Sequence, residues 1–539
     1  MNVNLSKKEI VLFVFFAAFS FFLMFKTFQI TPFGELKIAL KVWSDFAATI
    51  PLIRSFSLGD NIPPQYPLFA GPPIRYHFLF FFVVGFLEKI GLRLDFALNS
   101  LSAISFFFLL SIIYLLARTV FKKASIATLS IVLFLFNGSF AFTQFIKTHP
   151  LTFQIIPAIV KNKVFSSFGP YDGNTISAFW SLNIFTNQRH LAFSYAAFLL
   201  LVLFLFKFVE KKNFSKMNIL FLSALVGFFP FFHLAVFGMM EIALVAFFLL
   251  YRKFRKEIFT VVFISLLIAL PQIYMIGPSQ IKIPLFSPGY LIGKLSIINF
   301  LTYWFKNLGL TLILAPAGFI LAKKGQKKLF LVFLSLFAVG NIFGLSPEIA
   351  ANHKFFNLFL IGANIFTAYF LYLLWRRAIY GKILGLVLIF FLVFSGLIDF
   401  FPIINDTYIK LPDYRENPTA SFIFNHTPKD SVFLNATYLY DPASLAGRKI
   451  FLGWPYFSWS AGYDTDSRFS EMKELLSSNN KFLLCGLLRQ RGISYVEIQN
   501  PTSIENITIN YSFFENNFIK IFEDNRSKIS IFNVSLSCN

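Results

Sequence analysis

The chain has 539 residues, of which 56% are hydrophobic and 14% are charged, and its mean hydropathy is +0.67. Soluble proteins usually carry about 25% charged residues, so this composition excludes an ordinary soluble enzyme. The formal charge of +22 does not indicate a nucleic-acid partner, because Lys and Arg gather at the ends of apolar runs, where they determine topology and contact lipid headgroups. The sequence therefore predicts a polytopic membrane protein.

A membrane-spanning helix needs about 20 mostly apolar residues. The segments that come close to this length are 9–29, 96–118, 124–143, 190–209, 257–276, 306–322, 328–345, 355–375 and 381–400. Two more stretches are short or broken: 76–91 ends at Glu88 and Lys89, and 217–251 is interrupted at Pro230–His233. We expect about 11–13 transmembrane helices, the first of them a retained helix rather than a cleaved signal peptide.

Four Lys- and Arg-rich loop segments predict the topology. They lie at 207–216, 252–256, 323–328 and 376–382, and the positive-inside rule makes their side cytoplasmic. The outer side then holds the C-terminal domain and the loops 143–190, 277–305 and 345–354. The front end disagrees, because with Lys7 and Lys8 inside, three segments separate the first loop from loop 143–190 where an even number is required. Either 76–91 does not cross fully, or the front end contains a further half-helix.

The composition changes near residue 401, which divides a membrane domain, 1–400, from a C-terminal domain, 401–539. The C-terminal part reads as strands at SVFLNA, RKIFLG and ISYVEIQ and as helices at SRFSEMKELLSS and KFLLCGLLRQRG. The fold class is thus an all-α polytopic membrane domain with a soluble α/β or α+β domain. Two cysteines, Cys485 and Cys538, are too few for a disulfide framework, and whether they pair stays open.

The first outer loop, 26–77, carries the most informative residues. An amphipathic segment over 36–56 has Asp45 near its start and is expected to lie along the membrane surface. A Pro- and Gly-rich stretch follows, with Asp60 as a secondary candidate acid. Arg75, Tyr76 and His77 then open the next apolar run and are candidates for binding the substrate or its phosphate. Such a loop can form the wall of an active site. The structural alternative is that Asp45 flanks an interfacial helix and Arg75 reaches lipid phosphates.

Cations recur where later outer loops meet spanning helices. Arg189 and His190 precede one helix, and His353 and Lys354 precede another. Ionisable residues at this depth are costly, and they are usually functional or paired. These four residues are therefore candidates for binding a phosphate, and their convergence with Arg75 on one cavity is a prediction. The alternative is independent anchoring at the headgroup level.

The first loop resembles that of the GT-C glycosyltransferases, most of all family 39, the protein-mannosyltransferase-like enzymes. The resemblance rests on Asp45, Gly59 and the element PPIRYH at 72–77. It implies a polyprenyl-phosphate-linked sugar as donor and Asp45 as the catalytic base or the group that orients the acceptor hydroxyl. The family often shows an Asp-Glu pair, whereas Phe46 follows Asp45 here.

The chemistry is consistent with this reading, because a carboxylate can accept the acceptor proton and cations can neutralise a departing phosphate. The expected function is transfer of a sugar from a polyprenyl-phosphate donor to an extracytoplasmic glycan, lipid or protein, in the plasma (inner) membrane. The alternative is a transporter or flippase of a lipid-linked precursor, which typically shows related halves and midplane charges. No cofactor is expected: the histidines lack zinc-site spacing, although the D-x-D at 464–466 leaves a divalent metal open.

Overall fold

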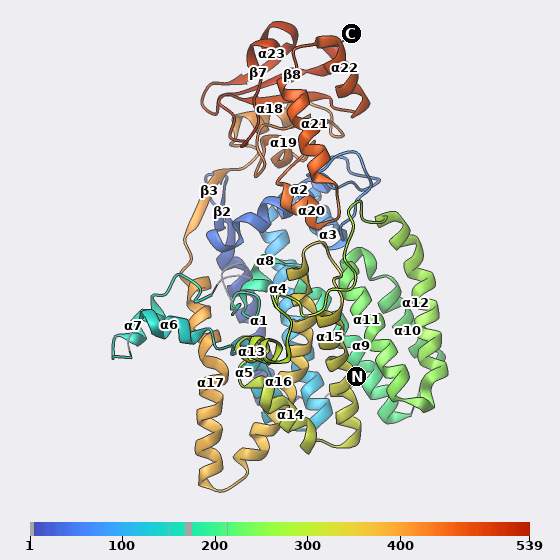
Figure 1. Cartoon of the computed structure of the whole chain (residues 1–539), viewed down its shortest axis with the longest axis vertical. Helices are drawn as coiled ribbons and strands as arrows, with labels where there is room; N and C mark the ends of the chain where they lie inside the picture. Colours follow the sequence, from blue (N-terminus) through green and yellow to red (C-terminus); the bar gives the residue numbers. More distant parts are fainter. Residues whose placement is uncertain (1–4, 150, 168–174, 213, 539) are drawn as a thin grey trace. The chain divides into compact units, whose positions relative to one another are not determined.

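The computed structural model describes residues 5–149, 151–167, 175–212 and 214–538, so part of loop 143–190 lies outside the described residues. The chain forms two compact units (Figure 1). Unit 1 comprises Met1–Thr27, Ser102–Pro271 and Pro284–Thr407, and unit 2 comprises Phe28–Leu101, Gln272–Ile283 and Tyr408–Asn539. The first outer loop therefore belongs to the same unit as the C-terminal domain.

Unit 1 is built from apolar helices. Eight helices of the described residues are long and apolar enough to cross a membrane: α1 (Lys7–Thr27), α4 (Leu94–Phe121), α9 (Leu191–Lys211), α11 (Pro230–Leu250), α12 (Arg255–Ile276, with the preceding turn), α15 (Lys324–Ile342), α16 (His353–Trp375, with the preceding turn) and α17 (Ile379–Ile404). A pair bent by 90°, α13 (Ile297–Leu308) and α14 (Thr311–Leu321), adds one span, and α5 (Ala124–Leu135) and α10 (Lys216–Gly227) are shorter apolar helices. The described residues therefore hold eight helices of spanning length, or nine with the bent pair, fewer than the 11–13 expected from the sequence.

The basic turns of unit 1 contact one another at one end of the helices. Arg118 at the end of α4 pairs with Glu9 at the start of α1 at 2.8 Å. Lys328 at the start of α15 donates to the carbonyl of Leu250 at the end of α11 at 2.5 Å. Gln326, also on α15, donates to the carbonyl of Val120 at the end of α4 at 2.9 Å. The N-terminal lysines and the Lys- and Arg-rich loop segments therefore share one end of unit 1.

This arrangement removes the inconsistency at the front end. Since α1 begins and α4 ends at the basic end, the chain crosses unit 1 once in each of these two helices. The apolar stretch 76–91 forms only the 11-residue α3 (Leu79–Lys89), which belongs to unit 2 and packs on α2 (Trp43–Ser57). After α17, Asn405 donates to the carbonyls of Val160 and Asn162 in the loop before α9, at the other end.

Two expected spans, 124–143 and 306–322, are wrong in extent, and glycines explain why. The first stops at Leu135, and Gly138 then lies against the backbone of Leu392 so closely that a side chain has no space. The second bends at Gly309, whose φ of +56° suits glycine and whose Cβ would lie 2.5 Å from the carbonyl oxygen of Gly138. The expected break in 217–251 is confirmed, since α11 begins at Pro230 and His233 has a non-helical backbone.

Unit 2 joins the first loop to the C-terminal domain through a small antiparallel sheet. Its order is β1 (Phe28–Ile30), β2 (Glu35–Ala39), β3 (Tyr408–Pro412). The segment 36–56 is thus a strand followed by the helix α2, rather than one amphipathic helix. One face of α2 packs on α3 and another on α19 (Pro442–Leu445), and eleven of its fifteen residues are buried.

The C-terminal domain contains a mixed sheet with the order β5 (Lys449–Ile450), β4 (Val432–Leu434), β6 (Tyr495–Gln499), β8 (Ile529–Asn533), β7 (Ile519–Asp524). Around it lie α18 (Pro418–His426), α20 (Pro455–Ser460), α21 (Thr465–Ser477), α22 (Lys481–Gln490), α23 (Tyr511–Asn517) and α24 (Val534–Ser537). The expected α/β or α+β class is confirmed, and Cys485 and Cys538 form a disulfide. The D-x-D begins α21, where Asp464 caps the helix by accepting from the Ser467 amide.

Two buried acids meet in the core of this domain. Asp441 caps α19 and accepts from the amides of Ala443, Ala436 and Thr437 at 3.0–3.2 Å. Glu497 on β6 is fully buried and donates from its carboxyl group to Asp441. Burial and the Asp441 carboxylate both raise the pKa of Glu497 well above its ordinary value. Glu497 is therefore protonated at neutral pH, and Asp441 carries the charge that the amides stabilise.

This pair makes stability depend on pH. Burial also raises the pKa of Asp441 to about 6. Between this value and the raised pKa of Glu497, the folded domain binds one proton more than the unfolded chain, so stability falls by about 1.4 kcal/mol per pH unit. We expect Glu497→Gln, which keeps a donor for Asp441, to flatten the dependence measured by thermal unfolding between about pH 6.5 and 8. The exposed Glu505→Gln is the control and keeps the wild-type slope. A wild-type slope in Glu497→Gln would show that Glu497 is ionised.

Candidate active site

Asp45 lies in the first turn of α2, on unit 2. The N-terminal end of a helix carries partial positive charge, which interacts favourably with an acidic side chain in the first turn. Its side chain is half-buried, while the next residue, Phe46, is fully buried and packs on Phe28 of β1 with ring centres 5.2 Å apart. The helix is therefore fixed in the core by its apolar face and presents the carboxylate at a partly open position.

Three tyrosines are close enough to Asp45 for its charge to act on them. Burial, and after it the Asp45 carboxylate, raise the pKa of Tyr76 and Tyr440. The pKa of Tyr66 is raised most by burial, less by the neighbouring Tyr76 and Tyr463, and least by Asp45. All three phenols stay protonated at neutral pH and can serve as hydrogen-bond donors. The site thus combines one carboxylate with a group of neutral hydroxyls.

Tyr440 is held in an unusual conformation beside this carboxylate. Its φ is +52°, a left-handed value that is rare for a bulky residue and occurs mostly where the surroundings impose it. The hydroxyl donates to the carbonyl of Trp43 at 2.5 Å, and the two ring centres lie 4.1 Å apart. The next residue is Asp441, so the buried acid pair of the core fixes the loop that presents Tyr440.

The residues Arg75, Tyr76 and His77 lie on the segment between the proline-rich stretch and α3. The Arg75 amide donates to the Tyr463 hydroxyl at 2.8 Å, and the Arg75 guanidinium donates to the carbonyl of Gly462 at 3.3 Å. The ring of Tyr76 stacks on that of His77 with centres 3.9 Å apart. All three side chains are half-buried. Of them, Tyr76 is the one whose pKa Asp45 affects.

Asp60 lies at the other end of α2. It follows the helix by three residues, and a separation of twelve helical residues between Asp45 and Ser57 corresponds to about 18 Å. Asp60 is exposed and lines a separate cavity of ≈ 110 Å³ with Phe56, Phe82 and Lys89 among its other lining residues. The structure therefore does not bring Asp60 to the Asp45 site.

Unit 1 holds a cluster of basic side chains at the end opposite the basic turns. Burial and the Lys354 ammonium lower the pKa of His190 to about 3. The ring centres of His190 and His233 lie 5.2 Å apart, and the hydroxyl of Tyr195 donates to the Lys354 carbonyl at 3.1 Å. His353 is an electrostatic neighbour of His233, and the ring centres of His353 and Phe179 lie 4.6 Å apart. Hereafter His190, His233, His353 and Lys354 are the basic cluster, in which Lys354 supplies the positive charge.

Arg189 precedes the basic cluster in sequence, but its guanidinium is directed toward α1. It donates to the Thr27 hydroxyl at 2.6 Å, to the Met24 carbonyl at 3.2 Å and to the Thr186 carbonyl at 2.8 Å. The side chain is 1% exposed. A cation that binds the last carbonyls of a helix also interacts favourably with its dipole. These bonds give Arg189 a structural contact with α1, whatever else it binds.

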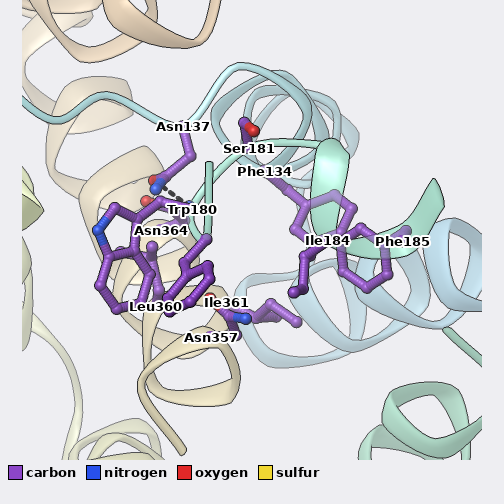
Figure 2. A pocket seen from close by; sticks show the side chains of 11 residues that line it. Phe134, Asn137, Trp180, Ser181, Ile184, Phe185, Asn357, Leu360, Ile361 and Asn364 are labelled. Atoms are coloured by element: carbon purple, nitrogen blue, oxygen red, sulfur yellow. Dashed lines mark hydrogen bonds between the residues drawn. The ribbon is translucent and has the colours of Figure 1, made fainter. Parts of the chain in front are cut away.

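A small cavity adjoins the basic cluster. Figure 2 shows the amides of Asn137 and Asn364 together beside Trp180, and the Asn364 amide donates to the Asn137 oxygen at 3.5 Å. Asn357, another lining residue, is 3.2 Å from the Nδ1 atom of His353. The cavity measures ≈ 20 Å³, which is room for a water molecule and far too little for a sugar. A water molecule in this cavity can hydrogen-bond to the side-chain amides near His353.

The sequence predicts roles for Asp45, Tyr76 and the cations before α9 and α16, but none for Tyr66 or Tyr440, and it favours a structural interior histidine at His233 over one that faces a cavity. Tyr66 stands in the proline-rich stretch, and Tyr440 is 395 positions after Asp45 in the chain. The break at Pro230–His233 was the only signal for His233. Because Asp45 and Arg75 belong to unit 2 and the basic cluster to unit 1, their convergence on one cavity stays a prediction.

Comparisons with known proteins identify the fold. No protein-family model and no curated protein matches the chain. The apo oligosaccharyltransferase of Archaeoglobus fulgidus matches with TM-score 0.52 at 11% identity, over 91% of this chain and 69% of its own. ArnT from Cupriavidus metallidurans, solved with undecaprenyl phosphate, also gives 0.52 at 11% identity, over 98% of both chains. The mycobacterial arabinofuranosyltransferase AftD gives 0.50 at 12% identity, over 99% of this chain and 40% of its own.

These structures are all GT-C glycosyltransferases. At identities of 11% and 12%, the likeness concerns the fold rather than the reaction. It extends over nearly the whole chain, including the apolar helices and the appended domain with its mixed sheet. The protein is therefore a multi-pass membrane protein with the GT-C fold.

Proposed function

We propose that this protein is a glycosyltransferase that moves a sugar from a polyprenyl-phosphate donor to a hydroxyl of an extracytoplasmic acceptor. The observation that carries the proposal is Asp45, a half-buried carboxylate at a helix N-terminus whose charge acts on three neutral tyrosines. The GT-C fold supports it, and so does the undecaprenyl phosphate bound by ArnT, which has the same fold. A carboxylate in such a setting can accept a proton from an alcohol.

In the proposed reaction, Asp45 accepts the proton of the acceptor hydroxyl as the acceptor oxygen bonds to the anomeric carbon of the sugar. The bond between that carbon and the phosphate oxygen breaks, and polyprenyl phosphate leaves with the electron pair. Negative charge grows on the leaving phosphate, where a cation stabilises the transition state most. Lys354 supplies that charge, and the imidazoles of the basic cluster supply hydrogen bonds. The proton then passes from Asp45 to solvent.

The direct test uses the full chain in nanodiscs with radiolabelled polyprenyl-phosphate monosaccharides and an extract of the cell-envelope glycans of the source organism. A transferase produces free polyprenyl phosphate and a labelled acceptor in equal amounts. A flippase, the alternative expected from the sequence, moves intact donor between leaflets of proteoliposomes and releases no polyprenyl phosphate. Flipping without release would overturn the proposal.

Lys354→Ala is expected to weaken donor binding by about 10- to 150-fold, because a hydrogen bond to a charged group contributes roughly 1.5–3 kcal/mol. Binding of a polyprenyl phosphate to the nanodisc-embedded protein, measured by native mass spectrometry, checks this value. The matched control is Lys382→Ala at the start of α17, an exposed lysine near the basic turns, which leaves the affinity unchanged. Equal affinities of wild type and Lys354→Ala would remove Lys354 from the phosphate site.

We also propose that the C-terminal domain lies outside the cytoplasm. Its disulfide supports this location, because disulfides persist in oxidising compartments. The basic turns support it as well, since they lie at the opposite end of unit 1 from Asn405, and positive loops stay inside.

Cysteine labelling of intact cells tests the topology. Both native cysteines are in the disulfide, so a single introduced cysteine is the only thiol among the described residues. We expect a membrane-impermeant maleimide to label Ser467→Cys and to leave Lys324→Cys unlabelled until the membrane is permeabilised. Both positions are exposed. The reverse pattern would place the C-terminal domain in the cytoplasm.

A further inference from the structure

Aromatic side chains with partly open rings gather on the C-terminal domain around α20. Trp454 and Tyr456 are each 42% exposed, and Trp459 and Tyr438 are half-buried. The ring of Trp454 meets that of Tyr438 edge-on with centres 6.0 Å apart, and Tyr456 and Trp459 also lie 6.0 Å apart. Tyr438, Trp454, Tyr456 and Trp459 are hereafter the aromatic platform.

The local sequence explains why these rings stay on the surface. Pro455 occupies the first position of α20, which starts the helix directly after Trp454. Within this short helix only Ser458 is buried, so the rings at 456 and 459 are left at its periphery. Large aromatic side chains usually contribute their area to a core. Here two of the four rings are 42% exposed, so their faces are accessible to a ligand.

The platform is attached to the loop that carries the candidate active site. The Gly453 amide donates to the Leu68 carbonyl at 2.8 Å, and the Tyr463 hydroxyl donates to the Pro73 carbonyl at 3.1 Å. Tyr463 also stacks on Tyr66, one of the tyrosines beside Asp45, at 5.8 Å. At the other edge of the platform, Tyr438 is two residues from Tyr440. The platform is therefore connected on one side to Tyr66 and on the other side to Tyr440, two tyrosines whose pKa the Asp45 charge helps to raise.

The charge of the platform limits what it can bind. The segment 453–461, GWPYFSWSA, has no charged residue. Helices that lie on membrane surfaces usually combine aromatic residues with Lys or Arg on the polar face, which this segment lacks. A neutral sugar ring fits better, because its C–H face packs on aromatic rings while its hydroxyls bond to Tyr O–H and Trp N–H groups at the ring edges.

We propose that the aromatic platform is an acceptor subsite that binds a neutral sugar ring next to Asp45. The inference rests on the proposed transferase function and names the class of acceptor, a glycan or glycolipid. The platform holds the sugar that precedes the reacting hydroxyl, so that this hydroxyl reaches the carboxylate. Its substitution is expected to affect use of the acceptor and to leave use of the donor unchanged.

The kinetic test compares Trp454→Ala and Tyr456→Ala with wild type, with the envelope glycan extract as titrated acceptor. We expect the extract concentration for half-maximal transfer to rise about tenfold in both variants while the donor KM stays constant. Trp454→Phe keeps a ring and recovers most of the loss. The matched control is Phe482→Ala, which removes a ring that is 92% exposed on α22 of the same domain and changes neither constant. Wild-type acceptor dependence in both alanine variants would overturn the subsite.

A binding test separates this inference from the transferase proposal. A bimane label on Ser460→Cys, at the end of α20, is expected to change its fluorescence saturably when the extract is added, and Trp454→Ala is expected to abolish the change. Saturable binding without any transfer would contradict the function and keep the subsite, whereas transfer without a fluorescence change would do the reverse. Strong quenching of the same label by brominated lipids would identify the platform as a membrane-contacting surface and overturn the proposal.

Discussion

Asp45→Asn is expected to lower the rate of sugar transfer by about 10²- to 10⁴-fold, the usual contribution of a general base. Asparagine has nearly the same shape but cannot accept the acceptor proton. The donor affinity is expected to stay constant, because the group that is lost acts on the acceptor. Loss of the charge at the helix N-terminus is expected to lower stability by about 0.3–1 kcal/mol. Transfer assays, donor binding and thermal unfolding of the same preparation measure the three quantities.

The other acid of the first loop provides the control. Asp60→Asn changes an exposed carboxylate about one helix length from Asp45, and it is expected to leave the transfer rate unchanged, because Asp60 is too far away to contact the reacting hydroxyl. Asp45→Glu keeps a carboxylate and is expected to retain part of the activity. If Asp45→Asn transferred sugar at the wild-type rate, Asp45 would be a structural residue of the helix start.

The membrane domain is largely predictable because its rules act locally. A bilayer requires about 20 apolar residues per helix, so long helices such as α9 and α16 stand out in the sequence within a few residues of their ends. The failures occur where a contact far away in the chain decides the geometry. Gly309 bends α13 against α14 because its backbone approaches Gly138, 171 positions earlier, and no local pattern announces that approach.

The same limit applies to the candidate site. Asp45 is recognisable because an isolated acid in a long, proline-rich outer loop between apolar helices is unusual. Tyr440 is not, because it reaches Trp43 through the pairing of β2 with β3, in which Leu36 is opposite Leu411. Strand pairs with such sequence separation follow from the tertiary fold rather than from residue patterns, and here they turn an expected surface helix into a strand and a buried helix.

A buried ion triad should dominate the stability of unit 2. Arg54 of α2 is 1% exposed, and its Nε atom lies 2.9 Å from the Glu88 carboxylate of α3, while its Nη2 atom lies 2.8 Å from the Asp413 carboxylate. It also donates to the Leu445 carbonyl of α19 at 3.2 Å. One side chain therefore connects the first loop, α3 and the C-terminal domain. A buried charge without its partner is strongly destabilising, typically by about 3–5 kcal/mol.

Arg54→Met is therefore expected to lower the unfolding free energy of unit 2 by about 3–5 kcal/mol, seen as a drop of about 6–20 °C in the melting temperature of this unit. Burial raises the pKa of Glu88 even beside Arg54. Without Arg54, the Glu88 carboxyl becomes still easier to protonate, so the loss of stability is smaller in acid.

Adding Glu88→Gln and Asp413→Asn removes both unpaired charges and should restore most of the stability, because neutral replacement of a buried ion group is often well tolerated. Lys520→Ala, which breaks surface pairs with Glu515 and Glu523, is the control and shifts the free energy by at most about 1 kcal/mol. A triple variant no more stable than Arg54→Met would mean that Arg54 acts through its packing and its bond to Leu445 rather than through charge.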